Sequence, residues 1–249
     1  MTRVSYLTFC VHNCLVPCLQ SRAAPCSSLI ILHDIFDTLE STQLLLANLT
    51  RETGHQVLLL NYPGQAFTEI TDMTLVTDAT IADSLHELLG TLHASGELCI
   101  DAEFPCRIVG FGFGGCIAQS YAARHASPAL AGLLLVNSFA HVDSQLAAIL
   151  HSTVNVFSCF PASKPELPIT YFSRFLFSDA FVTKVQLCWY LNCLVGHTPC
   201  ACDVHLQMTK SVAFDMYTAC NNPLTLEARV ALAKLMLRTS DHRCAPLVS

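Results

Sequence analysis

Four glycines at positions 110, 112, 114 and 115 lie within six residues, and this cluster constrains the fold more than any other feature. A short β-branched run, Ile108-Val109, precedes the cluster, and an alanine-rich segment follows it. The stretch 107–125 therefore predicts a strand, a tight turn and a helix. Glycine tolerates positive φ and lets backbones pack closely, as a sharp reversal from strand to helix requires. We expect the rest of the chain to be organised around this corner.

Apolar runs on both sides of the glycine cluster predict further strands. Predicted strands at 29–32, 56–60 and 133–136 alternate with segments of helical periodicity at 41–52 and 75–95. This alternation is typical of a parallel sheet made of right-handed βαβ units. The chain is 52% hydrophobic and only 13% charged, which suits strands that are buried on both faces. We predict an α/β fold with a mostly parallel, doubly wound sheet in residues 1–143.

The pattern changes after Asp143. No convincing strand follows, and helical segments are expected at 145–157, 171–194, 204–219 and 225–237, with prolines between them. We therefore predict that residues 144–249 form a second, helical region after the sheet.

Three short motifs resemble the α/β-hydrolase family in their order along the chain. His33-Asp34 stands where that family usually has His-Gly, and Asn61-Tyr62-Pro63-Gly64-Gln65 is similar to its Asp-x-Pro-Gly-x-Gly loop. The frame 110–114 resembles the nucleophile elbow G-x-S-x-G. The resemblance implies that Gly112 takes the nucleophile position and that the backbone N–H groups of Phe113 and Ile35 form the oxyanion hole. It also implies that the helices after residue 143 form a cap.

The sequence departs from the family at the catalytic positions. Acyl transfer needs a nucleophile, a histidine that takes its proton and a carboxylate that orients the histidine. Gly112 has no side chain, and residues 239–249 leave no room for the two strands that normally carry the acid and the histidine. Cys116 lies one helical turn past the nucleophile position, so its sulfur is expected to point away from the corner. We expect a degenerate, C-terminally truncated member that binds a ligand or a protein without catalysis.

A residual pocket is expected near the glycine corner. The polar residues that could line it follow the predicted strands: His33, Asp34, Asn137, His141 and Asp143. Backbone N–H groups at a helix N-terminus can bind a carbonyl or an anion without help from side chains, so a small acyl or anionic ligand is the expected occupant.

Two other functions stay open. The chain could be an active esterase-like hydrolase that uses residues we do not identify. Gly110, Gly112 and Gly115 also satisfy the G-x-G-x-x-G pattern of nucleotide-binding folds. That pattern expects an acidic residue at the end of the next strand, where this chain has Asn137-Ser138.

The apolar run 133–136 would be the last strand of the sheet, with an exposed outer edge. Such an edge is a template for pairing, so we expect a protein partner, a covering segment or further strands beside it. The net charge of −6 and the scattered 13 basic residues argue against nucleic-acid binding.

Membrane spans, metals and cofactors are not expected. No apolar run approaches the roughly 18 residues that a membrane helix needs. We interpret 4–11 and 15–19 as early strands rather than a signal peptide, and we expect a cytoplasmic protein. Two Cys/His clusters depart from standard zinc spacing, so we expect no metal at either. They consist of Cys10, Cys14 and Cys18 around His12, and of His197, Cys200, Cys202 and His205.

Overall fold

The computed structural model describes residues 27–38, 56–65, 72–161 and 226–243. The early strands expected at 4–11 and 15–19 lie outside these ranges. The helices expected at 41–52, 171–194 and 204–219 and both Cys/His clusters also lie outside them.

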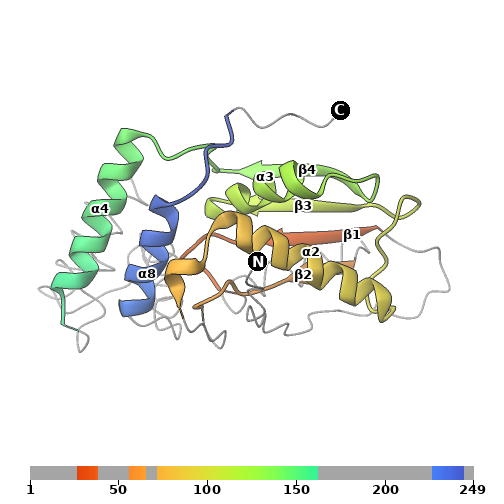
Figure 1. The fold of residues 1–249 in the computed structure, drawn as a ribbon, viewed down its shortest axis with the longest axis horizontal. Helices are drawn as coiled ribbons and strands as arrows, with labels where there is room; N and C mark the ends of the chain where they lie inside the picture. The colour runs from red at the N-terminus through yellow and green to blue at the C-terminus, as the bar shows by residue number, and fades with distance from the viewer. Residues whose placement is uncertain (1–26, 39–55, 66–71, 162–225, 244–249) are drawn as a thin grey trace, which may run out of the picture.

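Four parallel strands form the sheet in the order β2-β1-β3-β4. Their bounds are β1 Ser28–Leu32, β2 Gln56–Leu59, β3 Cys106–Phe111 and β4 Leu130–Val136. In the register of the sheet, Ile30 of β1 pairs with Leu58 of β2 on one side and with Ile108 of β3 on the other. The prediction of a parallel sheet in an α/β fold is confirmed (Figure 1).

Both faces of strands β1 and β2 carry apolar side chains, and β3 adds Ile108 to one of them. Ile30, Leu58 and Ile108 are buried in the core on the face that also packs the helices. Ile31 and Val57 alternate with them and are buried in a second cluster on the opposite face. Because successive side chains of a strand point to opposite faces, a continuous apolar run is what a strand with two buried faces needs.

Helices α2 Asp78–Ala94 and α3 Phe113–His125 lie together on the first face (Figure 1). The helix expected at 75–95 begins later than predicted. Residues 73–75 form a separate 3-10 turn, η1 Met73–Leu75, and Thr77 and Thr80 then cap α2 reciprocally through their side chains and backbone N–H groups. The cap satisfies N–H groups that would otherwise lack partners, and it thereby sets the start of the helix.

Helices α4 Ser144–Cys159 and α8 Leu226–Leu237 pack against each other beside the sheet (Figure 1). They confirm the helices expected at 145–157 and 225–237. Leu232, Leu235 and Met236 of α8 join the same core as the sheet. Among the described helices, none combines the length and the hydropathy needed to cross a bilayer.

β4 is an edge strand within the described sheet, and its apolar side chains are exposed. The exposed fraction is 36% for Leu133, 58% for Leu134 and 41% for Leu135. Leu134 points to the face opposite to its two neighbours, so both faces of the strand present leucine to solvent. The expected exposed apolar edge is therefore present.

Candidate functional site

The strand order reverses between β1 and β3. From β1 the chain moves to β2 on one side, whereas from β3 it moves to β4 on the other. In open parallel sheets the crevice at the carboxyl ends of two such strands is the usual place for a binding site. The loop that begins at His33 follows β1, and the glycine corner follows β3, so the two predicted motifs meet at this position (Figure 1).

Gly112 forms the corner between β3 and α3. Its backbone has φ 51° and ψ −118°, a combination that residues with a side chain rarely adopt. Two residues further on, Gly114 lies directly under the end of β1, where an added Cβ would lie 2.2 Å from the Leu32 carbonyl oxygen. Glycine therefore adopts the torsion angles at 112 without strain, and the corner needs glycine at 114 for close packing.

The carboxylate of Asp34 fills the space above Gly112. Its Oδ1 accepts hydrogen bonds from the backbone N–H of Phe113 at 2.9 Å and from the backbone N–H of Ile35 at 2.8 Å. A Cβ added to Gly112 would lie 2.3 Å from the same oxygen. The carboxylate thus takes the place of a side chain at position 112, and it rests on the N-terminus of α3, where negative charge is stabilised.

The loop after β2 braces the loop after β1. The Tyr62 hydroxyl donates to the His33 carbonyl oxygen at 2.7 Å, and the Gln65 side-chain amide donates to the Ile35 carbonyl oxygen at 2.7 Å. His33 is buried, and burial lowers its pKa, so the imidazole is neutral near pH 7. Its Nδ1 lies 2.8 Å from the Asp34 carbonyl oxygen, which this nitrogen reaches as a donor. These contacts fix the backbone that carries Asp34 and Ile35.

Cys116 is buried one turn into α3. Its thiol donates to the Phe139 carbonyl oxygen at 3.1 Å. Burial raises the pKa of Cys116 to about 12, so the sulfur is a thiol rather than a thiolate near pH 7. The side chain has the properties of a packed core residue.

Asn137, His141 and Asp143 follow β4, whose last residue, Val136, accepts a hydrogen bond from the Gly112 backbone N–H at 3.0 Å. Asn137 is exposed and has φ 50°, and His141 is half-buried. Asp143 caps α4 by accepting from the Leu146 backbone N–H at 2.8 Å. In the described ranges no hydrogen bond joins any of these three residues to Asp34 or Gly112. Of the five predicted pocket residues, His33 and Asp34 lie at the corner. Asn137 lies beside it, between Val136, which accepts from Gly112, and Ser138, which packs against Gly115.

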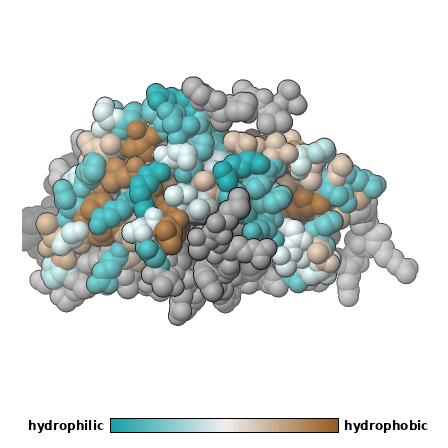
Figure 2. Space-filling view, in the orientation of Figure 1, coloured by the Kyte–Doolittle hydropathy of each residue, from teal (hydrophilic) through white to brown (hydrophobic). Residues whose placement is uncertain are grey.

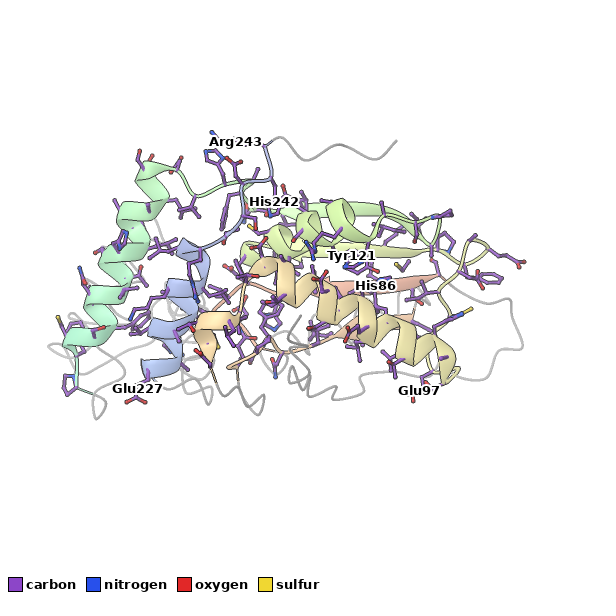
Figure 3. All side chains as sticks on the ribbon, in the orientation of Figure 1. His86, Glu97, Tyr121, Glu227, His242 and Arg243 are labelled. Carbon is purple, nitrogen blue, oxygen red and sulfur yellow. The ribbon has the colours of Figure 1, made fainter. Side chains whose placement is uncertain are left out.

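The structure also contains a buried pair, Asp78 and His242, that the sequence did not predict. Asp78, in the first turn of α2, accepts from His242 Nε2 at 3.1 Å and from the Ser240 backbone N–H and hydroxyl at 3.1 and 3.0 Å. The side chain of Asp78 is fully buried, and that of His242 is 6% exposed. The His242 backbone N–H donates to the Ala140 carbonyl oxygen, so the pair fastens the segment after α8 to both α2 and the loop after β4 (Figure 3).

The sequence offered no signal for this pair. Asp78 matches an ordinary acidic residue of a first helical turn, and its partner lies 164 residues away. Within the described part of the chain, no group of three or more His, Cys, Asp or Glu side chains is placed to hold a metal ion.

Comparison with known proteins adds to the geometry. No protein-family model matches the sequence, and no curated protein matches it. The solved structure of MGS-M2, an α/β-hydrolase enzyme from a Medee basin deep-sea metagenome library, is similar, with a TM-score of 0.60 and 17% identity over 89% of this chain and 67% of that one. The chain has the α/β-hydrolase fold.

Two further solved structures are similar to the chain. An esterase, EaEST, from Exiguobacterium antarcticum has a TM-score of 0.59 and 14% identity over 91% of this chain and 72% of its own. A bromoperoxidase from Bacillus anthracis has a TM-score of 0.60 and 12% identity over 88% of this chain and 69% of its own. The chain therefore spans about two thirds of the length of these structures.

Proposed function

We propose that the chain is a non-hydrolytic α/β-hydrolase-fold protein that acts by binding. The observation that carries the proposal is the carboxylate of Asp34, which accepts from both the Phe113 and the Ile35 backbone N–H groups above Gly112. These are the two N–H groups that the hydrolase resemblance assigns to the oxyanion hole.

Two requirements for ester hydrolysis, an attacking atom and a free oxyanion hole, are opposed by features of this corner. Gly112 offers no attacking atom, and the thiol of Cys116 is protonated and turned to the Phe139 carbonyl oxygen. An ester carbonyl would have to displace Asp34 from two hydrogen bonds, and a hydrogen bond to an ionised carboxylate is about twice as strong as one to a neutral acceptor. The developing oxyanion would also be repelled by the displaced carboxylate.

The same carboxylate disfavours the small acyl or anionic ligand expected at the corner. An anion, including a nucleotide phosphate, would meet Asp34 on the N-terminus of α3 rather than free N–H groups.

The β4 edge then becomes the better surface for binding. It is uncharged and apolar on both faces, so it is complementary to a second copy of itself in an antiparallel pair about a twofold axis.

We place the protein in the cytoplasm as part of this proposal. The four cysteines in the described ranges are free thiols, Cys99, Cys106, Cys116 and Cys159. Free thiols are typical of a reducing compartment, which supports this placement.

Hydrolysis of p-nitrophenyl butyrate tests the absence of catalysis. The wild type should release p-nitrophenol no faster than a Cys116→Ala variant, with Cys159→Ala as a control for an exposed thiol. Saturable turnover by the purified wild type would overturn the proposal. Loss of that turnover in Cys116→Ala would assign it to the buried thiol, whereas loss in Asp34→Asn would assign it to the carboxylate.

A further inference from the structure

A hollow of about 770 Å³ opens between η1, the C-terminal end of α4 and α8. Its size falls within the roughly 300–1,000 Å³ of small-molecule sites. Apolar side chains dominate its lining, chiefly Met73, Phe157, Phe160, Val230, Ala231 and Leu237. Figure 2 shows hydrophobic residues gathered over α4 and α8. No residue of the Gly112 corner lines the hollow, so it is a separate site.

Helix α8 has an apolar surface on two sides. Leu232, Ala233 and Met236 face the core and are buried. Val230, Ala231 and Leu237 are only half-buried and line the hollow. Residues 227, 230, 231, 234, 237 and 238 recur at the spacing of one helical face, so the helix presents a continuous stripe to the hollow.

Charge is distributed unevenly along this stripe. Lys234 is exposed, and within the described residues its ammonium makes no hydrogen bond or ion pair. Arg238 lies one turn further on, where its guanidinium donates to the Thr74 carbonyl oxygen at 2.8 Å and to the Met73 carbonyl oxygen at 3.0 Å. Glu227 lies about 10 Å from Lys234 along the helix axis, because each residue rises 1.5 Å. Figure 3 shows Glu227 at the opposite end of α8.

We propose that this hollow binds a single-chain anionic amphiphile, a fatty-acid carboxylate, with its chain along α8 and its head on Lys234. The mainly apolar lining of the hollow favours an alkyl chain over a compact polar ligand, and the positive end formed by Lys234 and Arg238 favours a negative head. Glu227 at the far end disfavours the reverse orientation. Affinity comes mainly from the buried chain, and the exposed lysine adds a smaller preference for the anion.

Displacement of cis-parinaric acid by dodecanoate, kept below its micelle concentration, tests the proposal on the full chain. We expect saturable displacement that is weakened about threefold to tenfold by Lys234→Gln. Glu227→Gln is the matched control, since it removes an opposite charge from the same face, and it should leave dodecanoate binding unchanged or tighter. Dodecyltrimethylammonium has a similar chain and the opposite charge, and it should displace the probe more weakly.

Filling the hollow gives an independent test. Ala231→Phe should abolish displacement while the melting temperature stays near that of the wild type, and Val230→Trp provides a second block if Ala231→Phe does not fold. The proposal is overturned if dodecanoate does not displace the probe from the wild type or if a folded blocking variant binds as tightly as the wild type. Equal affinity for the cationic and anionic amphiphiles would also overturn it.

Discussion

The carboxylate of Asp34 accepts a hydrogen bond from the backbone N–H of Phe113 at 2.9 Å, although the two residues are 79 positions apart. The contact joins the loop after β1 to the first residue of α3. It also places a negative charge where the hydrolase resemblance expects an oxyanion to form. The corner therefore holds a carboxylate of its own, and this contact supports the proposed lack of hydrolysis.

Adding a serine at the corner should not restore a hydrolase. In Gly112→Ser the new Cβ would lie 2.3 Å from Asp34 Oδ1, and φ 51° is strained for a residue with a side chain. We expect the free energy of unfolding to fall by at least about 1–3 kcal/mol, with no gain in p-nitrophenyl butyrate turnover. Urea denaturation measures the loss of stability.

The control for this change is Gly90→Ser in α2, where nothing lies within 4 Å of an added Cβ. That variant should be neutral or slightly stabilising, because serine is a better helix former than glycine. Combining Gly112→Ser with Asp34→Gly should recover part of the lost stability. If the effects of Gly112→Ser and Asp34→Gly on the free energy of unfolding were strictly additive, a clash between the new serine and Asp34 would be contradicted.

Cys116 should resist alkylation. Burial raises its pKa to about 12, so the reactive thiolate is scarce at pH 8. Iodoacetamide labelling read by mass spectrometry should modify exposed Cys159 readily and Cys116 only after denaturation. Labelling of Cys116 in the folded protein at the rate of Cys159 would contradict the buried, protonated state.

The Asp78–His242 pair should make stability fall in acid. Burial alone would raise the pKa of Asp78, but hydrogen bonds from His242 and Ser240 outweigh it and hold the pKa below its usual 3.8. A depressed carboxyl pKa contributes stability above the unfolded pKa and loses it as pH falls through the folded pKa. The contribution should therefore be complete well above the ordinary pKa of 3.8 and should be lost progressively as pH falls through the lower folded pKa.

Asp78→Asn tests this dependence. At pH 7 it should lower the free energy of unfolding by about 1–3 kcal/mol, because it weakens hydrogen bonds to a buried acceptor. Below pH 4 the difference in the free energy of unfolding between Asp78→Asn and the wild type should shrink. Asp143→Asn is the matched control, since asparagine caps helices as well as aspartate and should change little. A constant difference between Asp78→Asn and the wild type from pH 7 to pH 3 would refute the assignment.

The β4 edge should drive self-association. Leu134 is 58% exposed on an uncharged strand, and charged residues on an edge oppose strand pairing. We expect sedimentation velocity to show concentration-dependent dimers in the wild type and monomers in Leu134→Lys, with similar melting temperatures. A wild type that stays monomeric at all concentrations would count against pairing at this edge.

Local patterns predicted the corner and the sheet, because their signals lie within short stretches of sequence. The four glycines at 110, 112, 114 and 115 marked a strand-to-helix reversal, and the runs at β1 and β2 marked buried strands. Local patterns were less informative at boundaries. The strand expected at 133–136 begins earlier, at Leu130. Gly132, which lies before the expected strand, pairs with Arg107 and so belongs to the sheet.

Contacts between distant residues could not be predicted in the same way. The sequence placed Asp34 and Ile35 in the correct loop, but the direction of the Asp34 side chain depends on α3, which follows 79 residues later. The Asp78–His242 pair also requires the complete fold, because α8 must pack before His242 reaches α2. Side-chain geometry of this kind is set by tertiary packing rather than by periodicity.

Backbone amide NMR of Phe113 and Ile35 tests the central claim most directly. A carboxylate acceptor moves an amide proton downfield, so in Asp34→Asn both amide signals should move upfield together relative to the wild type. Asp37→Asn, which removes a neighbouring carboxylate without either hydrogen bond, should leave both signals nearly in place. Amide signals of Phe113 and Ile35 that are unchanged in Asp34→Asn would show that the carboxylate does not occupy this corner.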